Sequence, residues 1–238
     1  MRPILLSLFV LALGIQAHLV HAQGYPGGGG MGGPTPMGGR GGVSGPPDEA
    51  MPFTPSAEKP DKAATKAYAA GLKTMNKAHD LEDLIAKTTD PEKKAKAEGK
   101  LEDTYGVALD QFTEVLRNRS DMYDAWNQVG YVHLRLGAYR ESIDDYDHAL
   151  KLKPDLTNAI ANRALACLMA DQLDEAETAY MDLFYHQRPL ANELMVHMQE
   201  WVTRHRAVAN GVRPADIDSF AKWVTERSGI AQTAAAGG

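Results

Sequence analysis

The sequence predicts an all-α fold, a solenoid of about three stacked helical hairpins with further helices at its C-terminal end. Two observations indicate this fold. From Lys59 onward the apolar residues recur at the spacing of amphipathic helices. The chain also resembles itself at an interval of 34 residues. Self-similarity at such a period is typical of helical hairpins that bury their apolar faces against one another.

The repeat is clearest in the second helix of each hairpin. The central helix presents one apolar face, made by Tyr139, Ser142, Ile143, Tyr146, Ala149 and Leu150. A shift of 34 residues places Phe112 and Tyr180 at the position of Tyr146, and Glu177 is the one substitution that breaks the face. Three helices therefore share one pattern of burial.

The first helix of the central hairpin is predicted from its apolar side and its ends. That side is formed by Trp126, Val129, Gly130, His133 and Leu134. Gly137 permits the turn that follows, and Pro154 ends the hairpin because proline cannot continue a helix. Gly130 lets the two helices approach closely, with aromatic side chains filling the space beside it.

The first hairpin is predicted to be longer than the others. If Gly71 corresponds to Gly130, the two are separated by 25 residues more than one period. Asp90-Pro91 is typical of a helix cap followed by a first-turn proline. We therefore expect two elongated helices at about 60–88 and 91–118.

The C-terminal part is predicted to form two more helices, within 189–230. One apolar stripe runs through Leu194, Met198 and Trp201, and another, after Pro214, through Ile217 and Phe220. These helices are expected to cover the last hairpin as a cap, with a divergent fourth repeat as the alternative. The Ala-Gly tail, 231–238, is expected to be unstructured.

The N-terminal part differs in composition from the rest. Residues 1–22 combine Arg2, an apolar run and a small-residue exit at Ala22, the pattern of a cleaved secretory signal peptide. An uncleaved anchor helix is the alternative. Residues 23–58 are rich in Gly and Pro without a collagen period, which predicts a disordered linker. The protein is therefore expected to be exported, either periplasmic or secreted, with no membrane span after signal cleavage.

The net charge and the cysteine content argue against some classes of function. The formal net charge of -6 gives no electrostatic basis for nucleic-acid binding. Cys167 is the single cysteine, so no internal disulfide forms, and its position on the packing side predicts a buried thiol rather than a nucleophile.

Residues 123–156 resemble the tetratricopeptide repeat (TPR) in the offsets of their aromatic and small residues: Trp126, Gly130, Tyr139, Tyr146, Ala149 and Pro154. The resemblance is good for 157–188 and partial for a first unit at about 60–121, so it covers 59–188. It implies a right-handed solenoid whose first helices line a concave, protein-binding surface. His133, Ser142 and Arg163 depart from the family pattern.

Carried over by offset, the resemblance implies a set of protein-binding residues on these first helices: Tyr68, Leu72, Asn127, Tyr131, Arg135, Asn158, Asn162 and Leu165. Family members that hold the terminal carboxylate of chaperones use cations and Asn where this chain has Tyr68, Leu72, Gln128, Asn158 and Asn162. Without those cations, binding of a chaperone tail is not expected.

Catalytic and metal sites are not predicted, and no cofactor is expected. Glu193, His197 and Glu200 share a helix face, with His205 further along, but they are a fragment of a metal site at most. Asp144, Asp145 and Asp147 lack the glycine turn of a calcium loop and are expected to form a solvated helix face. The leading hypothesis is an exported, non-catalytic TPR adaptor that binds another protein or a peptide. The alternatives are a self-assembling homodimer of the cell envelope and, third, an enzyme or metal protein.

Overall fold

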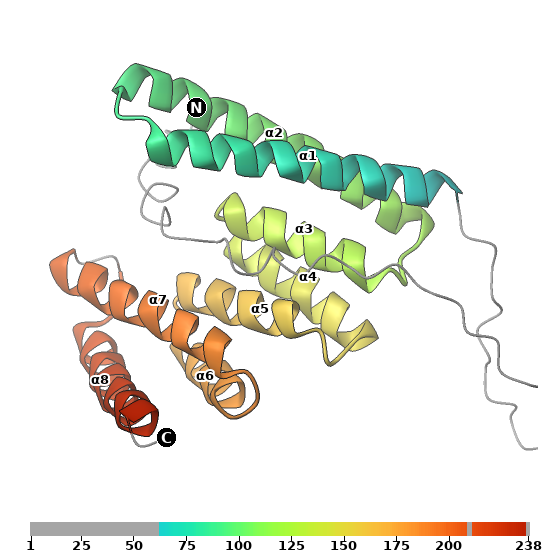
Figure 1. Ribbon diagram of the computed structural model, residues 1–238. Helices are drawn as coiled ribbons and strands as arrows, with labels where there is room; N and C mark the ends of the chain where they lie inside the picture. The colour runs from blue at the N-terminus through green and yellow to red at the C-terminus, as the bar shows by residue number, and fades with distance from the viewer. Residues whose placement is uncertain (1–61, 209–210, 237–238) are drawn as a thin grey trace, which may run out of the picture.

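The computed structural model describes residues 62–208 and 211–236, and this part of the chain is all-α (Figure 1). The helices are α1 (Lys62–Lys87), α2 (Pro91–Asn118), α3 (Tyr123–Arg135), α4 (Tyr139–Leu152), α5 (Thr157–Met169), α6 (Leu173–His186), α7 (Arg188–Ala207) and α8 (Pro214–Ala236). Each odd-numbered helix pairs with the next to form a hairpin, and each hairpin packs on the one before it. The predicted all-α hairpin solenoid is confirmed, whereas the signal peptide (1–22) and linker (23–58) lie outside the described residues.

A glycine faces an aromatic ring inside each of the first two hairpins. A Cβ added to Gly71 would lie 2.5 Å from Cε1 of Phe112, and one added to Gly130 would lie 3.0 Å from Cε1 of Tyr146. A methyl group at Gly71 would overlap the Phe112 ring, and one at Gly130 would require the Tyr146 ring to shift slightly. The two hairpins therefore use the same glycine–aromatic contact, which confirms that Gly71 corresponds to Gly130.

The turns between helices also repeat. Gly137 has a φ of 77°, and Asp171, one period later, has a φ of 60°. In both turns a backbone N–H reaches back five residues, from Ala138 to the His133 carbonyl and from Gln172 to the Cys167 carbonyl, each at 2.9 Å. This is the pattern of a helix C-cap that requires a left-handed residue. Aspartate adopts that conformation less readily than glycine.

Asp171 has a side-chain partner that fixes the turn. The indole Nε1 of Trp201 in α7 donates a 3.0 Å hydrogen bond to Asp171 Oδ1. The imidazole of His205 stacks on Trp201 with ring centroids 3.8 Å apart, and its Nε2 lies 3.5 Å from the same carboxylate oxygen. The turn after α5 is thereby tied to α7.

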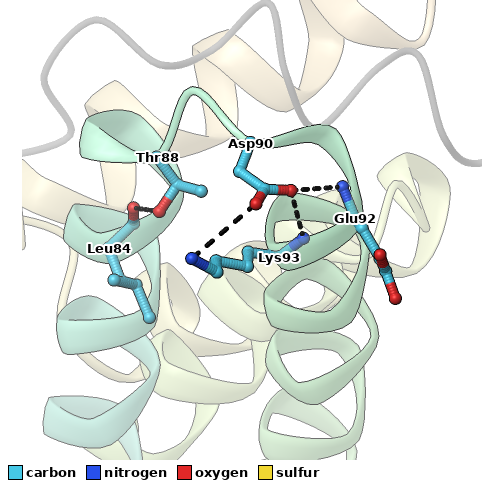
Figure 2. A network of polar contacts seen from close by, with 5 residues as sticks. All are labelled: Leu84, Thr88, Asp90, Glu92 and Lys93. Carbon is cyan, nitrogen blue, oxygen red and sulfur yellow. Dashed lines mark hydrogen bonds and ion pairs between the residues drawn. The ribbon is translucent and has the colours of Figure 1, made fainter.

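The first hairpin is elongated as predicted, and its connection is capped by Asp90 (Figure 2). Asp90 Oδ1 accepts hydrogen bonds from the backbone N–H groups of Glu92 and Lys93 at 3.0 and 3.2 Å. On the other side of the connection, the Thr88 hydroxyl donates to the Leu84 carbonyl at 2.6 Å. The cap satisfies two amides that α2 cannot satisfy itself, which explains why α2 begins at Pro91.

The last two helices continue the stack. Helix α7 packs against both α5 and α6, and α8 packs against α7. This placement covers the apolar side of the third hairpin, as expected of a cap, and it does so in the arrangement of a fourth hairpin.

Helix α8 continues to Ala236, so the expectation of an unstructured tail from 231 is wrong for 231–236. Alanine has the highest helix propensity of all residues, and this stretch contains several. None of the helices in the described part of the chain is both long and apolar enough to span a bilayer.

Two main clusters of buried apolar residues form the core. One joins α1 and α2 to Val129 and Val132 of α3. The other extends from Leu134 of α3 through α8 and includes Trp201 and Phe220. Helix α3 contributes to both clusters and therefore connects the long hairpin to the rest of the stack.

Candidate functional site

The first helices of the hairpins, α1, α3, α5 and α7, follow one another along the side of the molecule that faces the viewer in Figure 1. We call these four helices the first-helix row. The structure places all eight predicted binding residues on the row: two on α1, three on α3 and three on α5. Their surroundings differ, and the differences determine which of them can meet a partner.

The two predicted residues of α1 are partly used by the fold. Tyr68 is half-buried, and its ring meets Phe112 edge-on at a centroid distance of 5.6 Å. Leu72, also half-buried, packs against the cluster that joins α1, α2 and α3. Part of each side chain stays accessible to a partner, although the rest packs within the fold.

Arg135 has a structural partner that the sequence did not reveal. Its Nη2 pairs with Glu82 Oε1 of α1, and the two side chains are 12% and 19% exposed. The Tyr105 hydroxyl of α2 donates to the same carboxylate oxygen at 2.5 Å. Burial lowers the pKa of Arg135, but the nearby phenols of Tyr105 and Tyr131 and the Glu82 carboxylate raise it above its usual range. The guanidinium stays charged and ties α3 to α1.

Tyr131 lies beside this ion pair. Burial raises the pKa of its phenol to about 12, although the positive charge of Arg135 acts in the opposite direction. The His79 ring meets Tyr131 edge-on at 6.2 Å. Tyr131 is therefore neutral near pH 7, and part of its aromatic ring is exposed.

Asn127 differs from the other polar residues of the row. Its side chain is half-buried, and its Oδ1 is enclosed without a hydrogen-bond partner among the described residues. An enclosed acceptor without a partner costs about 1–3 kcal/mol. Asn127 therefore carries an acceptor that the fold leaves unsatisfied among the described residues.

The three predicted residues of α5 range from half-buried to buried. Asn158 and Leu165 are half-buried, and Leu165 packs against the large cluster of α3 to α8. Asn162 is only 8% exposed. Of these three, Asn158 and Leu165 retain surface that a partner can reach directly.

The three departures from the family pattern all make polar contacts within the central hairpins. His133 Nδ1 lies 2.6 Å from Asp145 Oδ2, and Arg163 Nε lies 2.5 Å from Asp147 Oδ1. Ser142 donates to the Gly130 carbonyl at 2.8 Å.

The expected solvated face of α4 is therefore wrong for two of its aspartates. Asp145 is buried beside the imidazole of His133 from α3, and Asp147 is half-buried beside the guanidinium of Arg163 from α5, while Asp144 is exposed. Asp145 and Asp147 therefore pair with side chains of the neighbouring helices in the hairpin stack.

The residues weighed for chemistry are dispersed. His197 Nδ1 lies 3.5 Å from Glu200 Oε2, whereas His205 is buried against Trp201. In the described part of the chain, no three metal-ligating side chains gather.

Cys167 is fully buried, as predicted. Burial raises the pKa of the thiol, which the nearby Arg163 guanidinium only partly opposes, and this favours the unreactive neutral form.

Comparison with known proteins agrees with this architecture. The family model described as Tetratricopeptide repeat matches residues 123–156. A curated protein described as Protein SGT1 homolog, from Oryza sativa subsp. japonica, is 26% identical over 94 residues, which cover 40% of this chain and 25% of that protein. The similarity thus spans about a quarter of that relative. The chain therefore contains a tetratricopeptide repeat at residues 123–156, which the structure folds as α3 and α4 within a longer stack of helical hairpins.

Proposed function

We propose that the protein is an exported, non-catalytic adaptor that binds another protein or a peptide through the first-helix row. A stack of helical hairpins presents a long, rigid surface, and such surfaces are used for recognition rather than for making or breaking bonds. The tetratricopeptide repeat at 123–156 supports a protein-interaction scaffold.

The observation that carries the proposal is the enclosed Oδ1 of Asn127 on the central helix of the row. This acceptor has no partner among the described residues. A peptide amide that donates to it recovers the lost hydrogen bond. The half-buried Leu72 of α1 and Leu165 of α5 supply apolar area on the helices to either side, and the half-buried Tyr131 supplies it on α3 itself.

Export is part of the proposal because of residues 1–22. If they act as a signal peptide, the protein recovered outside the cytoplasm begins at Gln23. Mass spectrometry of the N-terminus distinguishes this from an anchor, which retains Met1 and remains in the membrane fraction.

Photo-crosslinking tests the binding surface. A photoreactive phenylalanine analogue is introduced at Asn158, on the row, or at Arg140, an exposed residue on α4. Irradiation in the native host should give a discrete adduct from the Asn158 position and none from Arg140. Adducts of equal yield from both positions would contradict binding by the row.

A substitution then tests the proposed acceptor. Asn127→Ala should reduce the crosslink from position 158 and leave the unfolding temperature close to the parent value, because Asn127 Oδ1 accepts no hydrogen bond among the described residues. Arg135→Ala is unsuitable for this purpose because it breaks the ion pair with Glu82. An Asn127→Ala variant that crosslinks as well as the parent would remove Asn127 from the binding site.

Self-assembly is the second candidate, and exposed apolar residues on the last hairpin favour it. Val196 and Val208 on and after α7 are 48% and 58% exposed, and Ile230 of α8 is 47% exposed. Light scattering over a range of protein concentrations separates the two functions. A mass equal to one chain at all concentrations supports the adaptor, and a stable dimer that Val196→Lys dissociates supports assembly.

A further inference from the structure

A group of aromatic and arginine side chains lies where α6 approaches α8 and α7 begins, apart from the eight predicted binding residues on α1, α3 and α5. We define the aromatic–arginine patch as Tyr180, Phe184, Arg188, Trp223 and Arg227. The rings of Tyr180 and Phe184 have centroids 5.8 Å apart on α6, and Tyr180 meets Trp223 of α8 edge-on at 5.4 Å. The patch thus joins the second helices of the last two hairpins.

Each arginine of the patch lies over an aromatic ring, Arg188 at stacking distance and Arg227 within cation–π range. Arg188 Cζ lies 3.5 Å from the Phe184 ring centroid, and Arg227 Cζ lies 5.8 Å from that of Trp223. Neither guanidinium forms an ion pair with a carboxylate among the described residues, whereas Arg163 and Arg213 do. A stacked guanidinium keeps its N–H donors at the edge of the plane, where they can bind an anion.

The hydroxyl of Tyr180 is a buried donor without a partner. The residue has no exposed surface, and its hydroxyl oxygen has no hydrogen-bond partner in the described part of the chain. Burial raises the pKa of this phenol, and the charges of Arg188 and Arg227 both lower it in part. Both cations therefore act on this hydroxyl, which stays protonated near neutral pH and can donate to an anion that the arginines attract.

Tyr146, one period earlier, provides an internal comparison. Its hydroxyl is also buried without a partner in the described residues. Burial raises the pKa of Tyr146, and the charged groups that act on it include the acidic Asp145 as well as Arg135. The same position in two repeats thus holds a phenol without a hydrogen-bond partner among the described residues, but only Tyr180 has two arginines that lie over neighbouring rings.

The acids near the patch limit the charge of a ligand. Glu177 on α6 is half-buried, and burial and the neighbouring Asp174 raise the pKa of its carboxyl, while Arg227 lowers it. A doubly charged phosphate would meet stronger repulsion from these acids than a single carboxylate. A planar carboxylate also matches the fork of a guanidinium.

We propose that the aromatic–arginine patch binds a glutamate or aspartate side chain in an acidic peptide segment of a partner protein. Arg188 and Arg227 hold the carboxylate, and the Tyr180 hydroxyl donates a third hydrogen bond. Arg188 is exposed, so its side chain can turn to admit the ligand. Tyr185, 74% exposed and 5.7 Å from the Phe184 ring, offers contact area to an apolar residue beside the acid.

Calorimetric titration of the full chain with two blocked peptides tests the site. The probes are Ac-Gly-Phe-Glu-Phe-Gly-NH2 and its counterpart with Gln in place of Glu. The Glu peptide should bind at least roughly tenfold more tightly, because its charge-assisted hydrogen bonds are lost in the Gln peptide. Equal affinities, or no binding of either peptide, would overturn the proposal.

Substitutions locate the binding. Replacing both arginines, Arg188→Gln with Arg227→Gln, should abolish the preference for the Glu peptide, and Tyr180→Phe should weaken its binding severalfold. Tyr146→Phe removes the matched phenol and should have no effect on peptide binding, which controls for changes in packing. Persistence of the preference in the double arginine variant would exclude the patch.

The two proposals can fail separately. Asn127→Ala should leave Glu-peptide binding unchanged because Asn127 lies on the first-helix row rather than in the patch. Loss of peptide binding in that variant would place the acidic-peptide site on the row.

Discussion

At the scale of single residues, close contact between two helices requires glycine at some positions of the chain. Gly71 and Gly130 face aromatic rings that an added Cβ would overlap or crowd, whereas Gly99 and Gly106 of α2 have no atom within 4 Å of an added Cβ. The first pair of glycines permits helix contact, and the second pair only weakens a helix. The sequence pattern predicted Gly130 as a close contact because Tyr146 recurs in step with it.

These glycines give the first prediction. Gly71→Ala should lower the free energy of unfolding by ~1–3 kcal/mol because the new methyl group overlaps the Phe112 ring. Gly99→Ala should raise it by about 0.5–1 kcal/mol, since alanine favours the helix and meets nothing. Urea unfolding followed by circular dichroism measures both. Similar midpoints for the two variants would show that the Phe112 contact yields at little cost.

The raised pKa of the Tyr131 phenol predicts how the free energy of unfolding depends on pH. Burial raises its pKa from 10.0 to about 12, so the folded state favours the neutral phenol. This contribution to stability is complete below about pH 10 and is lost as the pH rises from about 10 to about 12. The free energy of unfolding should therefore fall over that range, by at most about 1.4 kcal/mol per pH unit for this residue.

Unfolding in urea at several pH values between 9 and 11.5 measures the decline. Tyr131→Phe should decline less steeply than the parent, because other buried tyrosines remain but this one no longer titrates. A parent curve that is flat from pH 9 to 11.5 would contradict the buried environment assigned to Tyr131.

At the scale of helices, the sequence predicted most elements and missed the contacts between distant ones. The two long helices and the Asp90 cap followed from local patterns, and the structure confirms them. The pairing of Arg135 with Glu82 joins residues 53 positions apart, which no local pattern specifies. The sequence pattern therefore predicted Arg135 as a binding residue only. Its ion pair with Glu82 also connects α3 to the C-terminal part of α1.

The pairing of α1 with α3 gives a prediction at this scale. Glu82→Gln should lower the free energy of unfolding by roughly 3 kcal/mol, because it leaves the largely buried Arg135 without its counter-charge. Asp216→Asn breaks the exposed pair with Arg213, whose side chain is 81% exposed, and should cost less than about 1 kcal/mol. Thermal and urea unfolding of both variants measure the difference.

A double variant separates charge from packing. Glu82→Gln combined with Arg135→Met removes both charges and should recover much of the lost stability. If the double variant were as unstable as Glu82→Gln alone, the loss would come from packing around α1 rather than from an unpaired guanidinium.

At the scale of the whole molecule, stability is distributed along a line of neighbouring hairpins. One core cluster holds α1 and α2 to α3, and the other runs from α3 to α8. In such an architecture each hairpin contacts only its neighbours, so the stability of one end need not depend on that of the other. Local unfolding of the least stable hairpin would then be enough to disrupt the surface that the first-helix row forms.

Local unfolding of the first hairpin is the expected consequence. Gly71→Leu forces a branched side chain into Phe112 and should expose α1 and α2 without unfolding α5 to α8. Amide hydrogen exchange measured by mass spectrometry should become faster throughout 62–118 and remain at the parent rate in 157–207. Gly106→Leu, in the same hairpin but with no atom within 4 Å of an added Cβ, should not make exchange faster in either region. Equally faster exchange from 62 to 236 in Gly71→Leu would instead show that α3 couples the two clusters into one cooperative unit, and binding by the row would then depend on every hairpin at once.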